Sequence, residues 1–549
     1  MMSLLPSDFQ TRIVNRGIEL SFSLIFCYLF FCFYFYFTKA AFPLHDIDSA
    51  GMVQLLQNVA KGNGLVSSIF SSFYDLLPLL PTNVADFEKS TFSSVHSETS
   101  FFRWHAYLIA YPMVVPIIMG AEATTVAISA VTVCLTLSIV VPAYWVAKKS
   151  NNLLLGILFL ICAFNWVPWN NALFGQLYFD RLFLGTQTVL ILTSFSLIKN
   201  AKSHRVISGL MWLSAVAGCL ISERTSLMVG CYFVGLIILY WRSLVKNRAQ
   251  LFQFGVLAVI PLIWVLFYTN LYYDSPYAAT TSLTVIFRNL TNFLDPSSKY
   301  YADSITLFLT VLPFCFLALL NLRFGLICIL TVIPNFLISV GGAEKIAFAT
   351  HYHMMYVPFL IAGAAIGLSS INKWIKRDEW SKSKKSIVIM FLLLVGVWNL
   401  SLSIINSPLG VFTQTKSLDE IAGTLKDLDA KRALNISVHS SAMPALLDLE
   451  NTVFSAFPVG IYDVDYLVAY YVVKEANHNL VIGNYRPNAL EAKIQFIEKI
   501  IERDFQLLQI QDSRLQPYQS RIYQLAEKII DRNIEPIQTQ YRIYQRRQN

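Results

Sequence analysis

Charged residues are scarce in this sequence. Asp, Glu, Lys and Arg make up 14% of the 549 residues, whereas a soluble domain usually carries about 25%. Hydrophobic residues make up 55% of the chain, and the mean hydropathy is +0.52. This composition argues against an ordinary soluble domain and indicates a protein that folds mainly in lipid.

Cysteines are missing from every segment predicted to face water. All eight lie inside apolar stretches, at positions 27, 32, 134, 162, 219, 231, 315 and 328. Buried cysteine behaves as a small hydrophobic residue, and no Cys/His spacing resembles a structural zinc site. The sequence therefore predicts neither a disulfide framework nor a zinc-binding domain.

A basic face suited to nucleic acid is also missing. The formal net charge is +8, but the Lys and Arg residues are spread over short loops between apolar stretches. A nucleic-acid footprint requires cations clustered on one face of a folded domain. We find no internal repeat and no low-complexity tract. These absences predict no nucleic-acid partner and leave the membrane lipid bilayer as the predicted environment.

Eleven long apolar stretches run through residues 17–406. Each reaches roughly the 20 residues that a helix needs to cross ~30 Å of hydrocarbon, and in lipid each segment must satisfy its own backbone hydrogen bonds. The predicted spans are 17–39, 122–147, 152–168, 180–199, 205–221, 224–243, 250–270, 303–321, 323–340, 351–371 and 386–406. We therefore expect an all-α polytopic membrane protein with about eleven transmembrane helices. The first span should remain as an anchor, with cleavage near Ala40 or Ala41 as the alternative.

Lys and Arg are concentrated in alternate loops between these spans. Cytoplasmic loops carry an excess of cations, which predicts a cytoplasmic N-terminus and an external C-terminus in a bacterial inner membrane. The basic loops contain Arg12, Arg16, Lys148, Lys149, Lys199, Lys202, Arg205, Arg242, Lys246, Arg248, Arg323 and the cations between Lys373 and Lys385.

The predicted outer segments are 40–104, 271–302 and the region after 406. Residues 1–406 form the predicted membrane domain, and 407–549 a small extracytoplasmic α/β domain whose basic polar tail, 538–549, is expected to fray. Met52, Leu55, Leu56 and Val59 have helical spacing, which predicts an amphipathic helix on the membrane surface. Residues 104–120 contain two prolines and predict a broken or interfacial helix.

The C-terminal region has its own pattern of elements. Residues 434–438 and 466–473 are predicted strands, and 489–503 and 520–531 are predicted amphipathic helices. Because both types occur, we expect an α/β domain outside the membrane.

Two carboxylates follow the first span. Asp46 and Asp48 lie two residues apart in a predicted loop, where they would serve as a general base or bind a divalent metal, Mg or Mn. The alternative is structural, because Asp is a favoured N-cap residue and a helix should begin near Ala50.

Arg103 and His105 lie at the mouth of the broken helix. The histidine would act as an acid, a base or a donor to phosphate, with the arginine as a phosphate ligand. The alternative is an interfacial pair that bonds to backbone or lipid headgroups.

Two further charged pairs lie at predicted outer ends of spans. Asp180 and Arg181 form one pair, and Glu223 and Arg224 form the other. Arginine beside a carboxylate suits the bidentate binding of phosphate. Two structural ion pairs that close the helix bundle are the alternative.

His351 and His353 form the last candidate. Residues two apart do not share a helix face, so the two imidazoles are poor joint metal ligands. One of them would line a substrate cavity, and the other would anchor the membrane interface.

The order of these short motifs resembles a bacterial membrane-protein family, domain of unknown function 2079. The resemblance is carried by Asp48, Gln54, Asn58 and Gly62, by His105 before Tyr107 and Pro112, by Ser222–Thr225, by Pro334–Leu337, by His351, Tyr352 and Pro358, and by Asn435–Pro444 with Phe457, Pro458, Asp465 and Tyr466. It covers nearly the whole chain. The turn around Glu223 departs from the family pattern, because Glu223 is its single carboxylate.

The family in turn resembles the C-type glycosyltransferase superfold, whose members use polyprenyl-phosphate sugars. The resemblance implies that Asp48, or its neighbour Asp46, is the catalytic base, and that Arg103, His105 and Arg224 bind the phosphate. It also implies an envelope glycan, lipid or protein as the acceptor.

Three functions remain open at this point. A glycosyltransferase would use the outer charges for chemistry. A transporter or lipid flippase would need ionisable residues at mid-membrane depth, whereas most charges here lie at span ends. An envelope assembly protein would use its outer domain to bind a partner.

Overall fold

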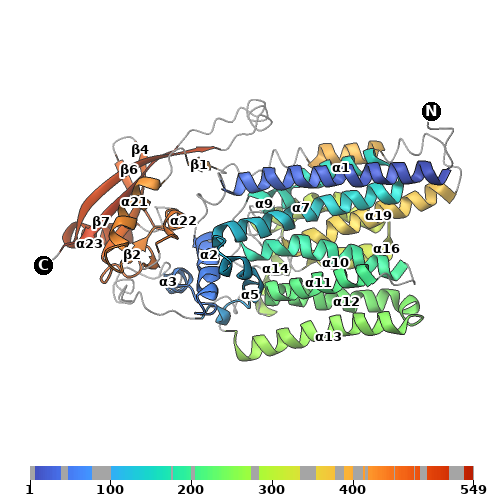
Figure 1. Cartoon of the computed structure of the whole chain (residues 1–549), viewed down its shortest axis with the longest axis horizontal. Helices are drawn as coiled ribbons and strands as arrows, with labels where there is room; N and C mark the ends of the chain where they lie inside the picture. Colours follow the sequence, from blue (N-terminus) through green and yellow to red (C-terminus); the bar gives the residue numbers. More distant parts are fainter. Residues whose placement is uncertain are drawn as a thin grey trace.

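The computed structural model describes most of the chain, namely residues 7–38, 47–76, 100–174, 177–199, 205–273, 283–333, 354–377, 389–399, 412–414, 418–449, 452–474, 477–482, 491–517 and 537–547. Figure 1 shows two parts, a bundle of long helices and a sheet domain at one end of it. We call this end of the bundle the sheet-side end. Helix α1 begins at the opposite end (Figure 1).

Five described helices are long and apolar enough to cross a membrane. They cover Val14–Tyr36 in α1, Ala123–Ser150 (α7), Phe179–Lys199, Glu223–Leu244 (α12) and Arg248–Leu271 (α13). The third consists of the 3₁₀ turn η5 (Phe179–Arg181) and α10 (Leu182–Lys199). Large apolar side chains such as Tyr28 and Phe31 on α1 are about 70% exposed, as expected for a lipid-facing surface. The protein is therefore a multi-pass membrane protein.

Shorter apolar helices lie in other predicted spans, and one of them, Arg205–Ile221, covers the whole of its span 205–221. They are Leu153–Phe164 (α8), Arg205–Ile221 (α11), Leu307–Leu319 within α15, Val357–Ser370 within α19 and Ile389–Asn399. Helix α16 (Leu322–Leu330) covers the first part of 323–340, whose remainder lies partly outside the described residues. Five of the eleven predicted spans thus contain a described helix that is both long and apolar enough to cross a membrane.

Smaller helices lie among and around the long ones. They are α2 (Ile47–Ala60), α3 (Ser68–Leu76), α5 (Ala110–Met113), α6 (Val115–Ile118), α9 (Val167–Phe174) and α14 (Leu283–Leu294), together with the 3₁₀ turn η4 (Phe101–Arg103). The complete helices extend beyond the apolar parts given above: α1 covers Ser7–Tyr36, α15 covers Lys299–Leu319 and α19 covers Val357–Arg377. The short pair α5 and α6 confirms the broken helix predicted across the two prolines.

Helix α2 forms where the sequence predicts it, but its surroundings differ. Met52, Leu55 and Leu56 are fully buried, and Val59 is 8% exposed. The helix packs against α3, α5, α7 and α22 (Met443–Leu446). The prediction of an amphipathic helix lying on the membrane surface is therefore wrong, because protein rather than lipid covers its apolar face.

The polar side chains of α2 hold the loop that follows it. Gln54 accepts from the Ser67 hydroxyl at 2.6 Å and donates to the Ser68 hydroxyl at 3.0 Å. The Asn58 amide donates to the Val66 carbonyl at 2.8 Å, across a turn in which Gly62 has φ +84°. Such a φ suits glycine. Gln54, Asn58 and Gly62 therefore shape the link between α2 and α3.

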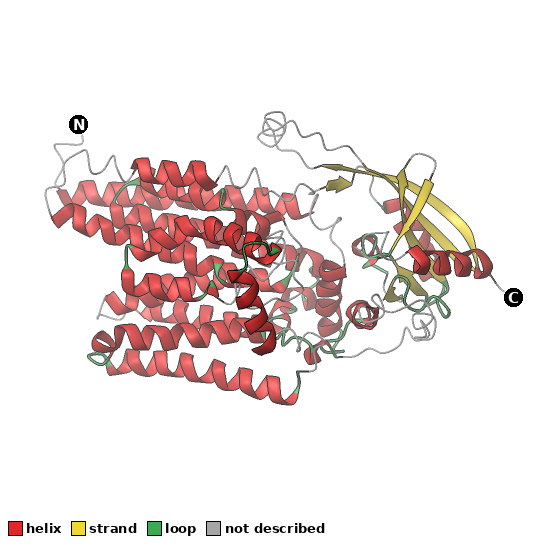
Figure 2. Ribbon diagram, turned by 180° about the vertical axis from the view of Figure 1, so that it is seen from behind, coloured by secondary structure: helices red, strands yellow, loops and turns green. Residues whose placement is uncertain are grey.

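The C-terminal domain is a mixed sheet with helices on both faces (Figure 2). Its described strands are β1 (Phe412–Gln414), β2 (Asn435–Val438), β3 (Val453–Ala456), β4 (Tyr466–Lys474), β5 (Asn477–Val481), β6 (Phe505–Pro517) and β7 (Ile537–Arg546). The strand order is β1-β6-β7-β4-β2-β3, and β5 pairs with β4. Strands β2, β3 and β4 are parallel, and the other pairings are antiparallel.

Two helices cover this sheet. Helix α23 (Glu491–Asp504) packs Ile497, Ile500 and Ile501 with Leu467 and Tyr471 of β4. On the other face, α21 (Asp419–Asp429) buries its own apolar residues and bonds to β6 through side chains. The predicted strands around 435 and 466 and the predicted helix around 491 are present. The predicted helix 520–531 lies outside the described residues.

The prediction for the end of the chain is wrong. Residues 537–546 do not fray but form β7, which pairs with β6 on one side and β4 on the other. Tyr541 and Ile543 are buried, because the apolar residues of this segment occur between polar ones and meet the faces of the sheet. Because the segment is rich in Gln and Arg, its composition alone does not reveal this alternation of polar and apolar residues.

The sheet domain is docked onto α2 and α3. The Gln57 amide donates to the Leu447 carbonyl at 3.2 Å, and the Ser72 hydroxyl accepts from the Ala456 backbone N–H at 2.8 Å. Phe70 belongs to the same buried apolar cluster as residues of both parts. The α2–α3 pair therefore forms a platform between the helix bundle and the sheet.

Candidate functional site at the sheet-side end of the bundle

Four of the predicted charged residues meet at the sheet-side end. His105, Asp180, Glu223 and Arg224, here called the charged cluster, come from three separate segments of the chain. Asp180 is fully buried, and Glu223 and His105 are 6% and 8% exposed. The Arg224 side chain is 23% exposed. The convergence predicted for these residues is therefore present in the structure.

Glu223 is the centre of this cluster. It is the first residue of α12, where Ser222 is the N-cap and forms a reciprocal capping box with Thr225. One carboxylate oxygen of Glu223 lies 2.9 Å from Nδ1 of His105, and the other accepts from the Ala106 backbone N–H at 3.1 Å. A carboxylate at a helix N-terminus is also favoured by the helix dipole.

The partner of His105 sets its tautomer. A carboxylate only accepts hydrogen bonds, so Nδ1 of His105 carries the proton that it donates to Glu223. Nη2 of Arg224 lies 3.4 Å from Nε2 and 3.5 Å from Nδ1 of His105, about equally far from the two ring nitrogens. This arrangement gives an imidazole oriented by Glu223 with a guanidinium nitrogen close to its ring. The alternative of a histidine bonded to lipid headgroups does not describe His105.

Arg224 links the two carboxylates. Its Nη2 lies 3.6 Å from Oδ2 of Asp180, and its Nε lies 3.6 Å from Oε1 of Glu223. Asp180 also accepts from the Ser222 hydroxyl at 3.0 Å. The predicted structural ion pairs therefore exist in part, but they join Asp180 in η5 and Glu223 in α12 through a single arginine, Arg224.

Arg181 points away from this cluster. Its guanidinium lies 5.8 Å from the ring centre of Phe37, at the end of α1. The side chain is 1% exposed, and its Nε and Nη1 atoms have no hydrogen-bond partner among the residues that the structure describes. Although Asp180 and Arg181 are adjacent, they do not pair with each other in the way the sequence suggests.

Arg103 lies at the same end of the bundle, in the turn η4, and its side chain is exposed. This turn is held by the Phe101 backbone N–H, which donates to the Leu65 carbonyl at 2.8 Å, and by the Tyr268 hydroxyl, which donates to the Phe102 carbonyl at 2.7 Å. Arg103 is therefore near His105 in the chain but has solvent access.

Asp48 lies in the first turn of α2, one residue after the helix begins at Ile47. It is therefore within the helix rather than the N-cap that the sequence suggests. The neighbouring Ser49 hydroxyl accepts from the Leu177 backbone N–H at 3.1 Å, three residues before Asp180. This bond ties the start of α2 to the segment that carries Asp180.

Three predicted site residues fall outside the described part of the chain: Asp46, His351 and His353. Within the described part, no group of three His, Cys, Asp or Glu side chains is arranged to hold a metal. In the charged cluster both carboxylates face Arg224, which makes the cluster a poor cation site. A metal bound by Asp46 and Asp48 stays a prediction.

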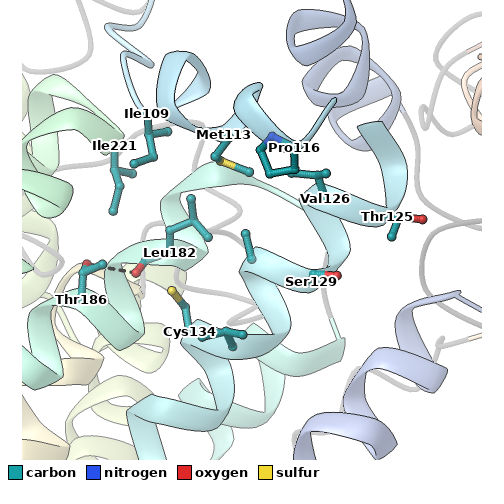
Figure 3. A pocket seen from close by; sticks show the side chains of 12 residues that line it. Ile109, Met113, Pro116, Thr125, Val126, Ser129, Cys134, Leu182, Thr186 and Ile221 are labelled. Atoms are coloured by element: carbon teal, nitrogen blue, oxygen red, sulfur yellow. Dashed lines mark hydrogen bonds between the residues drawn. The ribbon is translucent and has the colours of Figure 1, made fainter. Parts of the chain in front are cut away.

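An apolar groove lies beside the charged cluster. Its volume is about 550 Å³, and its walls come from α5, α6, α7, α10 and the end of α11. Figure 3 shows side chains of these elements around the groove. They are Ile109, Met113, Pro116, Thr125, Val126, Ser129, Ala130, Val133, Cys134, Leu182, Thr186 and Ile221.

Three segments supply both the cluster and the groove. The segment with His105 continues to Ile109, the segment with Asp180 continues to Leu182, and Ile221 directly precedes the turn with Glu223. The Ile109 backbone N–H donates to the Leu220 carbonyl at 2.6 Å, which joins two of these segments. A charged site and an apolar groove are therefore built next to each other from the same backbone.

Sequence reasoning missed two parts of the site. Ser222, which donates to Asp180, carries a detectable signal, because a serine before an apolar helical run is a typical N-cap. The groove has no such signal, because its apolar residues look like those of any membrane helix.

Comparison of the chain with models of known protein families gives no match, and comparison with curated proteins gives none either. The resemblance to the family of domain of unknown function 2079 and to the C-type glycosyltransferases therefore stays a prediction.

Proposed function

We propose that the protein is a membrane glycosyltransferase. It would move a sugar from a polyprenyl-phosphate donor to an envelope glycan, lipid or protein at the outer face of a bacterial inner membrane. The observation that supports this most is the apolar groove directly beside the charged cluster. A lipid-linked sugar has an apolar tail and a charged, hydroxyl-rich head, so it needs both surfaces next to each other.

The depth of the site agrees with this proposal. In the long described spans, charged side chains lie at the helix ends, as Asp180 and Glu223 do at the sheet-side end. A lipid phosphate lies at the same level, at the boundary of the hydrocarbon. A transporter or flippase would need charged groups at mid-depth, so the distribution favours chemistry at the boundary over transport.

The direction of the chain supports an external site. Helices α7, α10 and α12 end in Lys148 and Lys149, Lys199 and Arg242 respectively, at the end where α1 begins (Figure 1). By the positive-inside rule that end belongs in the cytoplasm. The charged cluster and the sheet domain would then face the outside.

In the proposed reaction Asp48 acts as the base. It would take the proton of an acceptor hydroxyl, whose oxygen attacks the anomeric carbon while the bond from that carbon to the phosphate oxygen breaks. The sugar changes configuration, and the lipid phosphate leaves. His105, Arg103 and Arg224 would stabilise the head group or phosphate, and the docked sheet domain would position the acceptor beside α2.

The test is a transfer assay with purified protein in nanodiscs, a radiolabelled polyprenyl-phosphate sugar and an envelope extract as acceptor. We expect transfer by the native chain and none by Asp48→Asn. Asp295→Asn is the matched control, because Asp295 is an exposed carboxylate in another loop. If Asp48→Asn transfers at the native rate, the assigned base is wrong. Movement of the intact lipid-linked sugar across the bilayer would instead indicate a flippase.

A further inference from the structure

Helix α14 is exposed on two chemically different sides. Phe287, Leu290 and Leu294 occur at positions i, i+3 and i+7, so they share one face of the helix, and they are 65%, 43% and 71% exposed. On the opposite side, Arg288 is exposed and Asn292 is half-buried. Neither water nor hydrocarbon alone suits both sides, whereas the boundary between a membrane and water does.

A hydrogen-bonded turn fixes α14 to the start of α15. Ser298 is the N-cap of α15. Its hydroxyl donates to the Asn292 carbonyl at 2.5 Å, and its backbone N–H donates to the Asp295 carbonyl at 3.1 Å. The Asp295 carboxylate accepts from the hydroxyl and the backbone N–H of Ser297 at 2.7 and 3.0 Å. These bonds set the angle between the two helices, and Figure 2 shows, from behind, that α14 crosses the long helices steeply near the sheet-side end.

The helices before and after α14 are exposed and apolar at the same end of the bundle. Phe267 and Leu271 in the last turns of α13 are exposed, and so are Ile305 and Phe308 near the start of α15. These side chains belong to the surface of a multi-pass bundle that faces lipid. Since α14 lies between α13 and α15 in the chain and packs against α15, its apolar face continues the lipid-facing surface at the outer boundary.

We propose that α14 is an in-plane membrane helix whose partner is the lipid of the outer leaflet. Phe287, Leu290 and Leu294 insert among the acyl chains, to a depth of about 5–10 Å, and Arg288 faces the headgroups and water. The helix then marks the level at which hydrocarbon ends on the sheet side of the bundle. This inference does not depend on the proposed reaction, because it concerns the contact with lipid and not the chemistry.

The first test is thiol labelling of the full chain in phosphatidylcholine nanodiscs with a charged, water-soluble maleimide. The variants are Phe287→Cys and Leu294→Cys on the apolar face, with Arg288→Cys as the matched control on the polar side. We expect Arg288→Cys to react at least about tenfold faster than the other two, because the reagent and the thiolate both need water. The native chain, whose eight cysteines lie in apolar stretches, gives the background, and all three variants should react alike after denaturation in detergent.

The second test needs no substitution and separates lipid from a protein partner. The native chain is placed in nanodiscs that contain a phosphatidylcholine with a diazirine in the upper part of one acyl chain, irradiated, digested and mapped. We expect lipid adducts on Phe287, Leu290 or Leu294 and none on Arg288. The exposed end of α13, with Phe267 and Leu271, is the internal positive control for a lipid-facing surface.

Three results would overturn the proposal. Equally fast labelling of the three cysteine variants would place the whole helix in water, and equally slow labelling would place both sides in hydrocarbon or protein. Slow labelling of Phe287→Cys and Leu294→Cys without lipid adducts on α14 would mean that a second copy or another protein covers the apolar face. Failure of the transfer assay would contradict the proposed reaction and leave the lipid contact of α14 intact.

Discussion

Removal of the negative charge of Glu223 should destabilise the sheet-side end of the bundle. The substitution Glu223→Gln keeps the size of the side chain but weakens two bonds, the 2.9 Å contact with His105 and the 3.1 Å bond from the Ala106 N–H. It also leaves Arg224 with one carboxylate in place of two. Hydrogen bonds to a charged group contribute about 1.5–3 kcal/mol each.

The expected loss follows from these contacts. Breaking a buried charge pair costs about 3–5 kcal/mol, and Gln keeps one accepting oxygen, so we expect a loss of about 2–4 kcal/mol for Glu223→Gln. For a large domain this corresponds to a melting temperature lowered by roughly 5–10 °C. The assay is thermal unfolding in detergent followed by tryptophan fluorescence, because Trp104 and Trp166 are buried.

A matched control separates this effect from the general effect of a Glu-to-Gln change. Glu122 precedes α7 and is exposed, so Glu122→Gln should change stability by less than about 0.5 kcal/mol. The double variant Glu223→Gln with His105→Ala should lose about 1–3 kcal/mol less stability than the sum of the losses of the two single variants. Equal melting temperatures for Glu223→Gln and Glu122→Gln would refute the central role assigned to Glu223.

Three further predictions concern packing, docking and pH. Gly185→Ala would bring a Cβ within 2.5 Å of the α7 backbone and should lower the stability by about 1–3 kcal/mol in the same melting assay. The control is Gly209→Ala, whose Cβ meets nothing within 4 Å, so this variant should have the native stability or a higher one. Ser72→Ala removes the acceptor of a β3 backbone N–H, so limited proteolysis should release the sheet domain faster; an unchanged rate would contradict the docking. Burial and a neighbouring carboxylate raise the pKa of Glu498, so its protonated form is favoured on folding and stability falls as the pH rises through that pKa. Glu498→Gln should therefore raise the melting temperature at pH 7 and not at pH 4, and the same gain in the exposed Glu491→Gln would contradict this cause.

The sequence alone predicts the membrane class and part of the site. Apolar stretches of spanning length are easy to recognise in a sequence because lipid tolerates few charges. These stretches predict α1, α7, α10, α12 and α13. The meeting of His105 with Glu223 was expected from their shared position at one side of the membrane. Their bond itself was not, since it depends on how the turn before α5 packs against α12.

Other features depend on packing that no local pattern reports. The apolar face of α2 contacts protein instead of lipid, although both surroundings select the same residues. Arg181 and Arg224 look equivalent in the sequence, but the rotation of η5 turns Arg181 toward Phe37. Strand β7 was missed because its apolar residues are separated by Gln and Arg.

In the proposed complex, a lipid-linked head group lies at the charged cluster while its tail fills the apolar groove. The most direct test is photo-crosslinking of the protein in nanodiscs with an isoprenyl phosphate that carries a diazirine in its tail, followed by peptide mapping. We expect labelling of residues 109–116, 125–134 and 182–186, and this labelling should fall when unlabelled isoprenyl phosphate is added in excess. Labelling confined to other helices, or labelling that unlabelled isoprenyl phosphate does not reduce, would contradict it.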